Sequence, residues 1–66
     1  MTADDIIERL RKIEAAKGDY ELARGLEDDL HEAFIRWIAE TGTEEQRAKA
    51  RIVLRSKQIE FARYCA

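Results

Sequence analysis

The 66-residue sequence contains no proline, three glycines and one cysteine. A single cysteine excludes a disulfide within the chain, and a reduced protein is typical of the cytoplasm. No apolar run is longer than three residues, whereas a membrane-spanning helix needs about 20 apolar residues. These absences predict a soluble, cytoplasmic protein that has no membrane partner. They also leave glycine as the main residue type that can end a helix.

The charges are divided unevenly along the chain. There are 12 lysines and arginines and 14 aspartates and glutamates, which gives a net charge of −2. Residues 1–43 hold six basic and eleven acidic side chains, a net charge of −5. Residues 44–66 hold six basic and three acidic side chains, a net charge of +3. The two parts can attract each other within one chain or between two chains.

The length predicts one domain over 1–66 and a small core. A chain of this size buries only about 60% of the surface that its unfolded state exposes. Such a core supplies about 3–5 kcal/mol, and natural proteins of this length often add a disulfide, a metal or a second subunit. Because the chain cannot form an internal disulfide, we expect a homodimer.

Capping patterns and glycines predict three helices. Thr2 followed by Asp5, and Thr43 followed by Gln46, are capping-box patterns. Asp19 is a favourable N-cap residue for the middle helix. Two of the three glycines stand where the first and second helices should end. The predicted helices cover 3–17, 19–41 and 44–57, and a tail covers 58–66.

The middle helix is the longest and carries a heptad-like apolar seam. The seam residues follow one another at spacings of three and four: Ala23, Leu26, Leu30, Ala33 and Trp37. Leu22, Phe34 and Ile38 widen this surface beyond what two shorter helices can cover. Gly25 either allows a close helix crossing or is a tolerated surface glycine.

The apolar residues of the third helix are fewer. Ala48, Ile52 and Val53 are expected to form its inward face, with Leu54 off that face. The apolar and aromatic side chains of the tail are expected to pack back onto the helices: Ile59, Phe61 and Tyr64.

Short links between helices favour antiparallel neighbours. The expected fold is therefore all-α, a short three-helix bundle with up-down-up order around a long central helix, and dimeric. The apolar surface left over by the bundle predicts a protein interface, since large aromatic residues dominate interface energetics. The predicted interface residues are Leu30, Phe34, Trp37, Ile38, Phe61 and Tyr64.

No group of residues predicts catalysis. His31 is the only histidine, and Glu27 shares its helix face at a spacing of four. One histidine with surface carboxylates is a weak metal signal, because zinc sites need three or four protein ligands. There is no nucleophile with a neighbouring base and no phosphate-binding glycine loop. We therefore predict no catalytic, cofactor or metal site, and a function in binding.

Nucleic-acid binding is the alternative function. Arg47, Arg51 and Arg55 lie four residues apart and predict a basic ridge along the third helix, which could contact phosphates. Against this, the pI of the chain is about 5.4. The simpler interpretation is that these arginines form a solvated face of the third helix, paired with the acidic middle helix.

The chain resembles the small helical accessory proteins of temperate phages and prophages of Gram-negative bacteria. The resemblance lies in the acidic segment Gly25-Leu26-Glu27-Asp28-Asp29-Leu30, the aromatic end of the middle helix, and the closing residues Phe61-Ala62-Arg63-Tyr64-Cys65-Ala66. In that family a proline commonly follows the tail phenylalanine, whereas Ala62 stands here. The resemblance implies a small dimer in a bacterial host cell that binds and inhibits a host protein, such as a quorum-sensing activator or a defence component.

Overall fold

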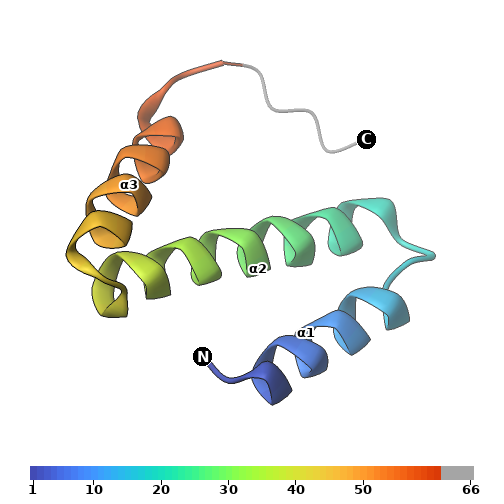
Figure 1. Ribbon diagram of the computed structural model, residues 1–66. Helices are drawn as coiled ribbons and strands as arrows, with labels where there is room; N and C mark the ends of the chain where they lie inside the picture. The colour runs from blue at the N-terminus through green and yellow to red at the C-terminus, as the bar shows by residue number, and fades with distance from the viewer. Residues whose placement is uncertain (62–66) are drawn as a thin grey trace.

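The computed structural model describes residues 1–61. Its elements in chain order are the helices α1 (Ala3–Ala15), α2 (Tyr20–Thr41) and α3 (Glu44–Leu54), and the short 3-10 helix η1 (Arg55–Gln58) (Figure 1). No strand occurs within this range, so the predicted all-α class is confirmed. None of the helices in residues 1–61 has both the length and the apolarity that crossing a membrane requires.

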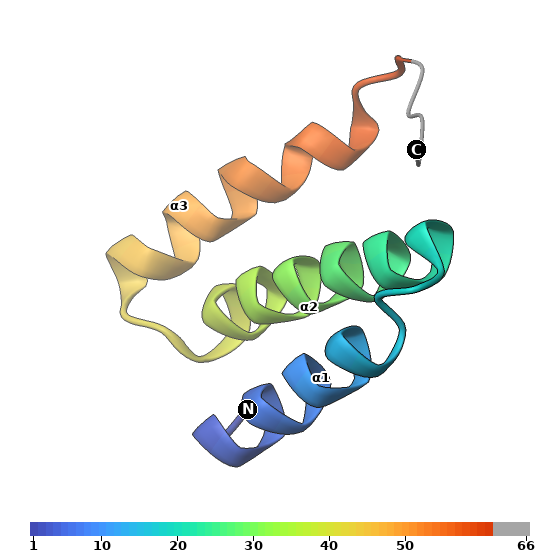
Figure 2. The same ribbon diagram turned by 90° about the vertical axis from the view of Figure 1, so that its right-hand side faces the viewer.

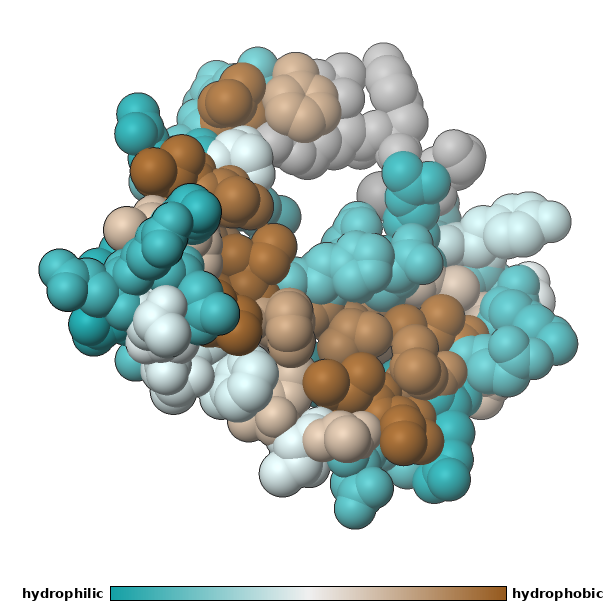
Figure 3. Space-filling model, viewed as in Figure 1, coloured by the Kyte–Doolittle hydropathy of each residue, from teal (hydrophilic) through white to brown (hydrophobic). Residues whose placement is uncertain are grey.

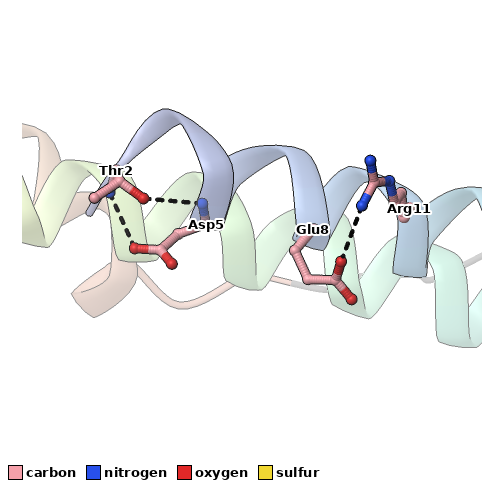
Figure 4. Close-up of polar contacts among 4 residues, drawn as sticks. All are labelled: Thr2, Asp5, Glu8 and Arg11. Carbon is pink, nitrogen blue, oxygen red and sulfur yellow. Dashed lines mark hydrogen bonds and ion pairs between the residues drawn. The ribbon is translucent and has the colours of Figure 1, made fainter.

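The starts of the helices are capped as predicted. The hydroxyl of Thr2 accepts a hydrogen bond from the N–H of Asp5 at 3.1 Å, and the Asp5 carboxylate accepts one from the N–H of Thr2 at 3.0 Å (Figure 4). Thr43 and Gln46 repeat this arrangement at the start of α3, at 3.2 and 3.0 Å. Asp19 accepts a hydrogen bond from a backbone N–H in the first turn of α2 at 3.2 Å. Each cap satisfies N–H groups that have no partner inside the helix.

Two helix ends differ from the expected positions. α1 ends at Ala15 rather than at residue 17, because the N–H of Ala16 is shared between the carbonyls of Lys12 and Ile13, at 3.1 and 3.0 Å. Sharing of this kind tightens the last turn and stops the helix. The third α-helix ends at Leu54, and the chain continues as a 3-10 turn to Gln58.

The three helices form one open layer with α2 in the middle. α1 runs antiparallel to α2, and α3 turns back from the far end of α2 at a wide angle (Figures 1 and 2). Within the described range, α1 and α3 each contact α2 and do not contact each other. The Cα atoms extend over 40 × 33 × 9 Å, with a radius of gyration of 13.6 Å. A compact chain of this length has a radius of gyration of about 11 Å, so the layer is not closed around a core.

The core of the described part is correspondingly small. Only Leu30, Ala39 and Ala50 are buried, at 8%, 7% and 7% exposure. Two of these three are alanines, and no side chain in the described range is fully enclosed. The five residues of the predicted α2 seam are all buried or half-buried. The seam prediction was therefore correct, although it produces a contact line between helices rather than a filled core.

The expected inward face of α3 is wrong for Ala48 and Ile52, whereas Val53 does line a groove against α2. Ala50 is buried and Leu54 is half-buried, whereas Ala48 is exposed and Ile52 is 61% exposed. The small side chain of Ala50 allows α3 to lie close to α2, and a residue about one turn away on each side then shares that contact. Because Ile52 is more hydrophobic than Ala50, the sequence prediction turned Ile52 inward. The predicted face was therefore about half a turn away from the observed one.

The expected packing of the tail does not bury its apolar residues in the described range. Ile59 and Phe61 are 61% and 62% exposed. Tyr64 lies outside the described residues. Nothing within 4 Å surrounds a methyl group placed on Gly25, so this residue is a surface glycine rather than the site of a close helix crossing.

Candidate protein interface

An apolar groove lies between α2 and α3. It has a volume of about 270 Å³. Its walls are formed by apolar residues, with two polar residues beside them: Phe34, Ile35, Ile38, Gln46, Lys49, Ala50 and Val53. We call this feature the α2–α3 groove. In the space-filling view, apolar surface spreads along the inner side of α3 and over α1 and the middle of α2 (Figure 3).

The rim of the groove is formed by large side chains that remain open to solvent. Phe34 is 42% exposed and Val53 is 51% exposed, whereas Ile38 is half-buried. The rings of Phe34 and Trp37 lie 5.8 Å apart between centroids, at 47° to each other. This tilted arrangement is favourable for aromatic pairs and holds the Phe34 ring at the mouth of the groove.

The structure divides the predicted interface residues into separate groups. Phe34 and Ile38 line the groove, and Trp37 supports Phe34 from the half-buried seam. Leu30 belongs to the core rather than to the surface. Phe61 is exposed beyond η1, away from the residues that line the groove.

The groove also contains residues that the sequence did not indicate as interface residues. Ile35 lies beside Phe34 in α2, and Ala50 and Val53 face them from α3. Their spacing was a usable signal, since Ile35 and Ile38, like Ala50 and Val53, are three residues apart and share a helix face. The wrong inward face of α3 prevented this pairing from being recognised.

A second, more polar hollow lies between α2 and η1. Its lining includes Asp28, His31 and Glu32. The Glu32 carboxylate lies 2.8 Å from Arg36 and 3.2 Å from Lys57. Hydrogen bonds from Arg36 and then from Lys57 hold the pKa of Glu32 below its ordinary value. Within the described residues there is no cluster of three groups that could hold a metal ion.

The ion pair between Glu32 and Lys57 joins α2 to η1. Every other ion pair within residues 1–61 lies inside one helix or between a helix and its end, as with Glu8 and Arg11 at 3.5 Å (Figure 4). The expected attraction between an acidic α2 and a basic α3 is therefore limited to one contact in this part of the chain. Most of the charge asymmetry remains open to other molecules.

The three arginines of the predicted basic ridge differ in exposure. Arg51 and Arg55 are exposed, whereas Arg47 is half-buried. The Nε atom of Arg47 is buried and has no hydrogen-bond partner within the described residues. Two of the three arginines are therefore open to solvent, and the phosphate-binding ridge stays a prediction.

Comparison with models of protein families, with curated proteins and with solved structures gives no match for this chain. The resemblance to phage accessory proteins, and the inhibition of a host protein that it implies, stay predictions.

Proposed function

We propose that the protein acts by binding another protein and catalyses no reaction. The observation that carries this proposal is the number of large apolar side chains that remain exposed on all three helices and after them. The residues are Ile7, Leu10, Tyr20, Leu22, Phe34, Ile52, Val53, Ile59 and Phe61, with exposures from 42% to 80%. Contiguous apolar patches are typical of protein interaction sites, and Phe34 and Val53 of this set lie together at the α2–α3 groove.

The composition of the groove supports binding rather than chemistry. Its walls consist mainly of hydrocarbon, and the polar side chains among its lining residues are Gln46 and Lys49. The Lys49 ammonium is paired with Glu45 at 2.8 Å. No pair of acid and base groups faces the groove, as proton transfer would require.

The charge of the chain limits the kind of partner. Residues 1–43 carry a net charge of −5, and few of their carboxylates are engaged by α3. A protein with an apolar patch edged by basic side chains would complement this surface. The resemblance to phage proteins suggests that such a partner is a bacterial host protein whose activity is inhibited by the binding.

Affinity capture from a Gram-negative bacterial lysate tests the proposal. Phe61→Ser and Tyr20→Ser form a matched pair, because both remove an exposed aromatic ring outside the α2–α3 groove. Phe61 lies two residues from the exposed Ile59, whereas Tyr20 stands at the start of α2. We expect the wild type and Tyr20→Ser to retain the same specific protein, and Phe61→Ser to lose it. A purified titration of that protein should give the same order of affinities.

Failure of the wild type to retain any protein that Phe61→Ser loses would count against the proposal. Nucleic-acid binding is the second candidate, because Arg51 and Arg55 are exposed and form no ion pair with another described residue. A mobility shift at low salt that disappears in an Arg51→Ala, Arg55→Ala double variant would favour it.

A further inference from the structure

Among the elements of residues 1–61, none covers the α2–α3 groove. α1 lies on the other side of α2 and does not contact α3 within the described range (Figure 2). We infer that the groove is covered by a second copy of this chain, related to the first by a two-fold axis. The inference deepens the proposed function, since it names one partner and the surface that binds it.

The exposed area is large enough for such a contact. The accessible surface of the chain is 5567 Å², whereas a compact monomer of this mass exposes about 4,300 Å². The difference, about 1,200 Å², exceeds the roughly 800 Å² that each partner contributes to a standard stable interface. Taken over the whole molecule, the extra exposed surface is therefore more than one standard stable contact would cover.

The shape of the groove suits a two-fold contact. In such a contact the same patch meets itself, so a projecting side chain and the hollow that receives it must lie on one surface. Phe34 is 42% exposed at the rim, directly beside the hollow formed with Ile38, Ala50 and Val53. Phe34 of each copy can then enter the groove of the other, and the contact is made twice.

The charges favour the same orientation. The part of the chain up to residue 43 has a net charge of −5, and the part from residue 44 has a net charge of +3. α2 holds two basic and six acidic residues, a net charge of −4, and α3 with η1 holds five basic and two acidic residues, a net charge of +3. A two-fold pairing that lays α3 and η1 of each copy along α2 of the other therefore brings opposite charges together twice. Pairing α2 with α2 alone would instead bring two acidic helices together, at an electrostatic cost.

Light scattering coupled to size exclusion tests the inference on the purified chain, without any other protein. We expect a mass twice 7.7 kDa at high micromolar concentration, and dissociation on dilution. Val53→Lys and Ile52→Lys are the matched variants. They are adjacent in α3 and 51% and 61% exposed, but only Val53 lines the groove. We expect Val53→Lys to weaken self-association at least about 30-fold, as for an interface hot spot, and Ile52→Lys to change it less than threefold.

Circular dichroism of both variants checks that helix content is kept. If Val53→Lys loses its helices, Phe34→Ser with Tyr20→Ser as control makes the same comparison from α2. A wild-type monomer at high micromolar concentration would overturn the inference and leave the groove to a different protein. A dimer that both lysine variants keep, or that both lose, would overturn the assignment to this groove. Neither result depends on capture of a host protein, so the proposed function can fail or stand separately.

Discussion

At the starts of the helices the chain supplies hydrogen-bond partners for its own backbone, whereas at the α2–α3 groove it leaves apolar space unfilled. At the starts, two residues three positions apart each accept a hydrogen bond from the backbone N–H of the other through the side chain, at 3.0 to 3.2 Å. The pairs are Thr2 with Asp5 and Thr43 with Gln46. At the groove, side chains from two helices line a hollow of about 270 Å³ that nothing in the described range fills. The helices are therefore complete as local structures, whereas their packing leaves this hollow open within the described residues.

The difference has a simple physical origin. A cap needs two residues of the right kind at a fixed spacing, and it forms as soon as the first turn does. A core needs apolar surface on all sides, and three short helices in a single layer cannot provide it. The stability of this chain should therefore depend strongly on its few buried contacts, and moderately on each cap.

Replacing Leu30 by alanine should have the largest effect. Leu30 is the only large side chain among the buried residues of the described part. Loss of a buried leucine side chain costs about 2–5 kcal/mol, which is comparable to the about 3–5 kcal/mol that a core of this size supplies. We expect Leu30→Ala to lose its cooperative unfolding transition, as followed by circular dichroism during heating or in urea.

Leu22→Ala is the matched control for that prediction. Leu22 lies in the same helix and is 52% exposed, so its removal should cost less than about 1 kcal/mol. Both variants are compared at one protein concentration, since stability of a self-associating chain depends on concentration. Equal losses in the two variants would show that the seam of α2 does not stabilise the protein as its burial indicates.

Two glycine-to-alanine substitutions should have opposite signs. A methyl group at Gly42 would lie 2.8 Å from the carbonyl oxygen of Ile38 and 3.0 Å from Gln46. We expect Gly42→Ala to destabilise by about 1–3 kcal/mol, because backbone must move to relieve the overlap. Gly25 has nothing within 4 Å of that position, so Gly25→Ala should stabilise by about 1 kcal/mol through helix propensity.

Urea unfolding of the two glycine variants beside the wild type measures both effects. If Gly42→Ala is as stable as the wild type, the link between α2 and α3 is more adaptable than the short contacts indicate. A destabilised Gly25→Ala would mean that another molecule lies against this face of α2, because the chain itself leaves the space open.

Removing one cap should have a smaller effect than removing a buried contact. Thr43→Ala deletes the hydroxyl that accepts a hydrogen bond from the N–H of Gln46 at 3.2 Å. Such a loss costs about 1 kcal/mol. Thr41→Ala is the matched control, since its hydroxyl donates back to the carbonyl of Trp37 at 2.7 Å at the end of α2. Bonds of this type do not favour the helix, so this variant should be neutral or slightly stabilised in thermal unfolding. A larger loss in Thr41→Ala would contradict the cap as the origin of the effect.

The same contrast explains what could be predicted from the sequence. The fold class, the N-caps of all three helices and the seam of α2 follow from spacings of three and four residues, and the structure agrees with them. The inward face of α3 was wrong, because the contact with α2 selects the small Ala50 rather than the more hydrophobic Ile52. The distance between two helix backbones decides how large a side chain fits at their contact. That distance cannot be read from the sequence of one helix.

The candidate interface was predicted in part for the same reason. Phe34 and Ile38 were recognisable as excess apolar surface of α2, but their partners in the groove, Ala50 and Val53, required the position of α3. Of the three arginines of the basic ridge, Arg47 is half-buried and the other two are exposed, a difference that their spacing did not predict. Helical periodicity identifies residues that share one face, but it does not say which face a neighbouring helix covers.

The smallest expected effect concerns the charge in the first cap. Hydrogen bonds from the backbone and then the side chain of Thr2 hold the pKa of Asp5 below its ordinary value, which is about 3.9 in an unfolded chain. Because the folded pKa is lowered, this stabilisation is fully present above about pH 4 and is lost as the pH falls through the folded pKa. Thr2→Ala removes the hydroxyl and keeps the backbone N–H, so the pKa of Asp5 should rise part of the way towards its ordinary value. A carboxyl-carbon NMR titration measures the shift directly, and an unchanged Asp5 titration in Thr2→Ala would mean that the backbone N–H of Thr2 alone holds the carboxylate.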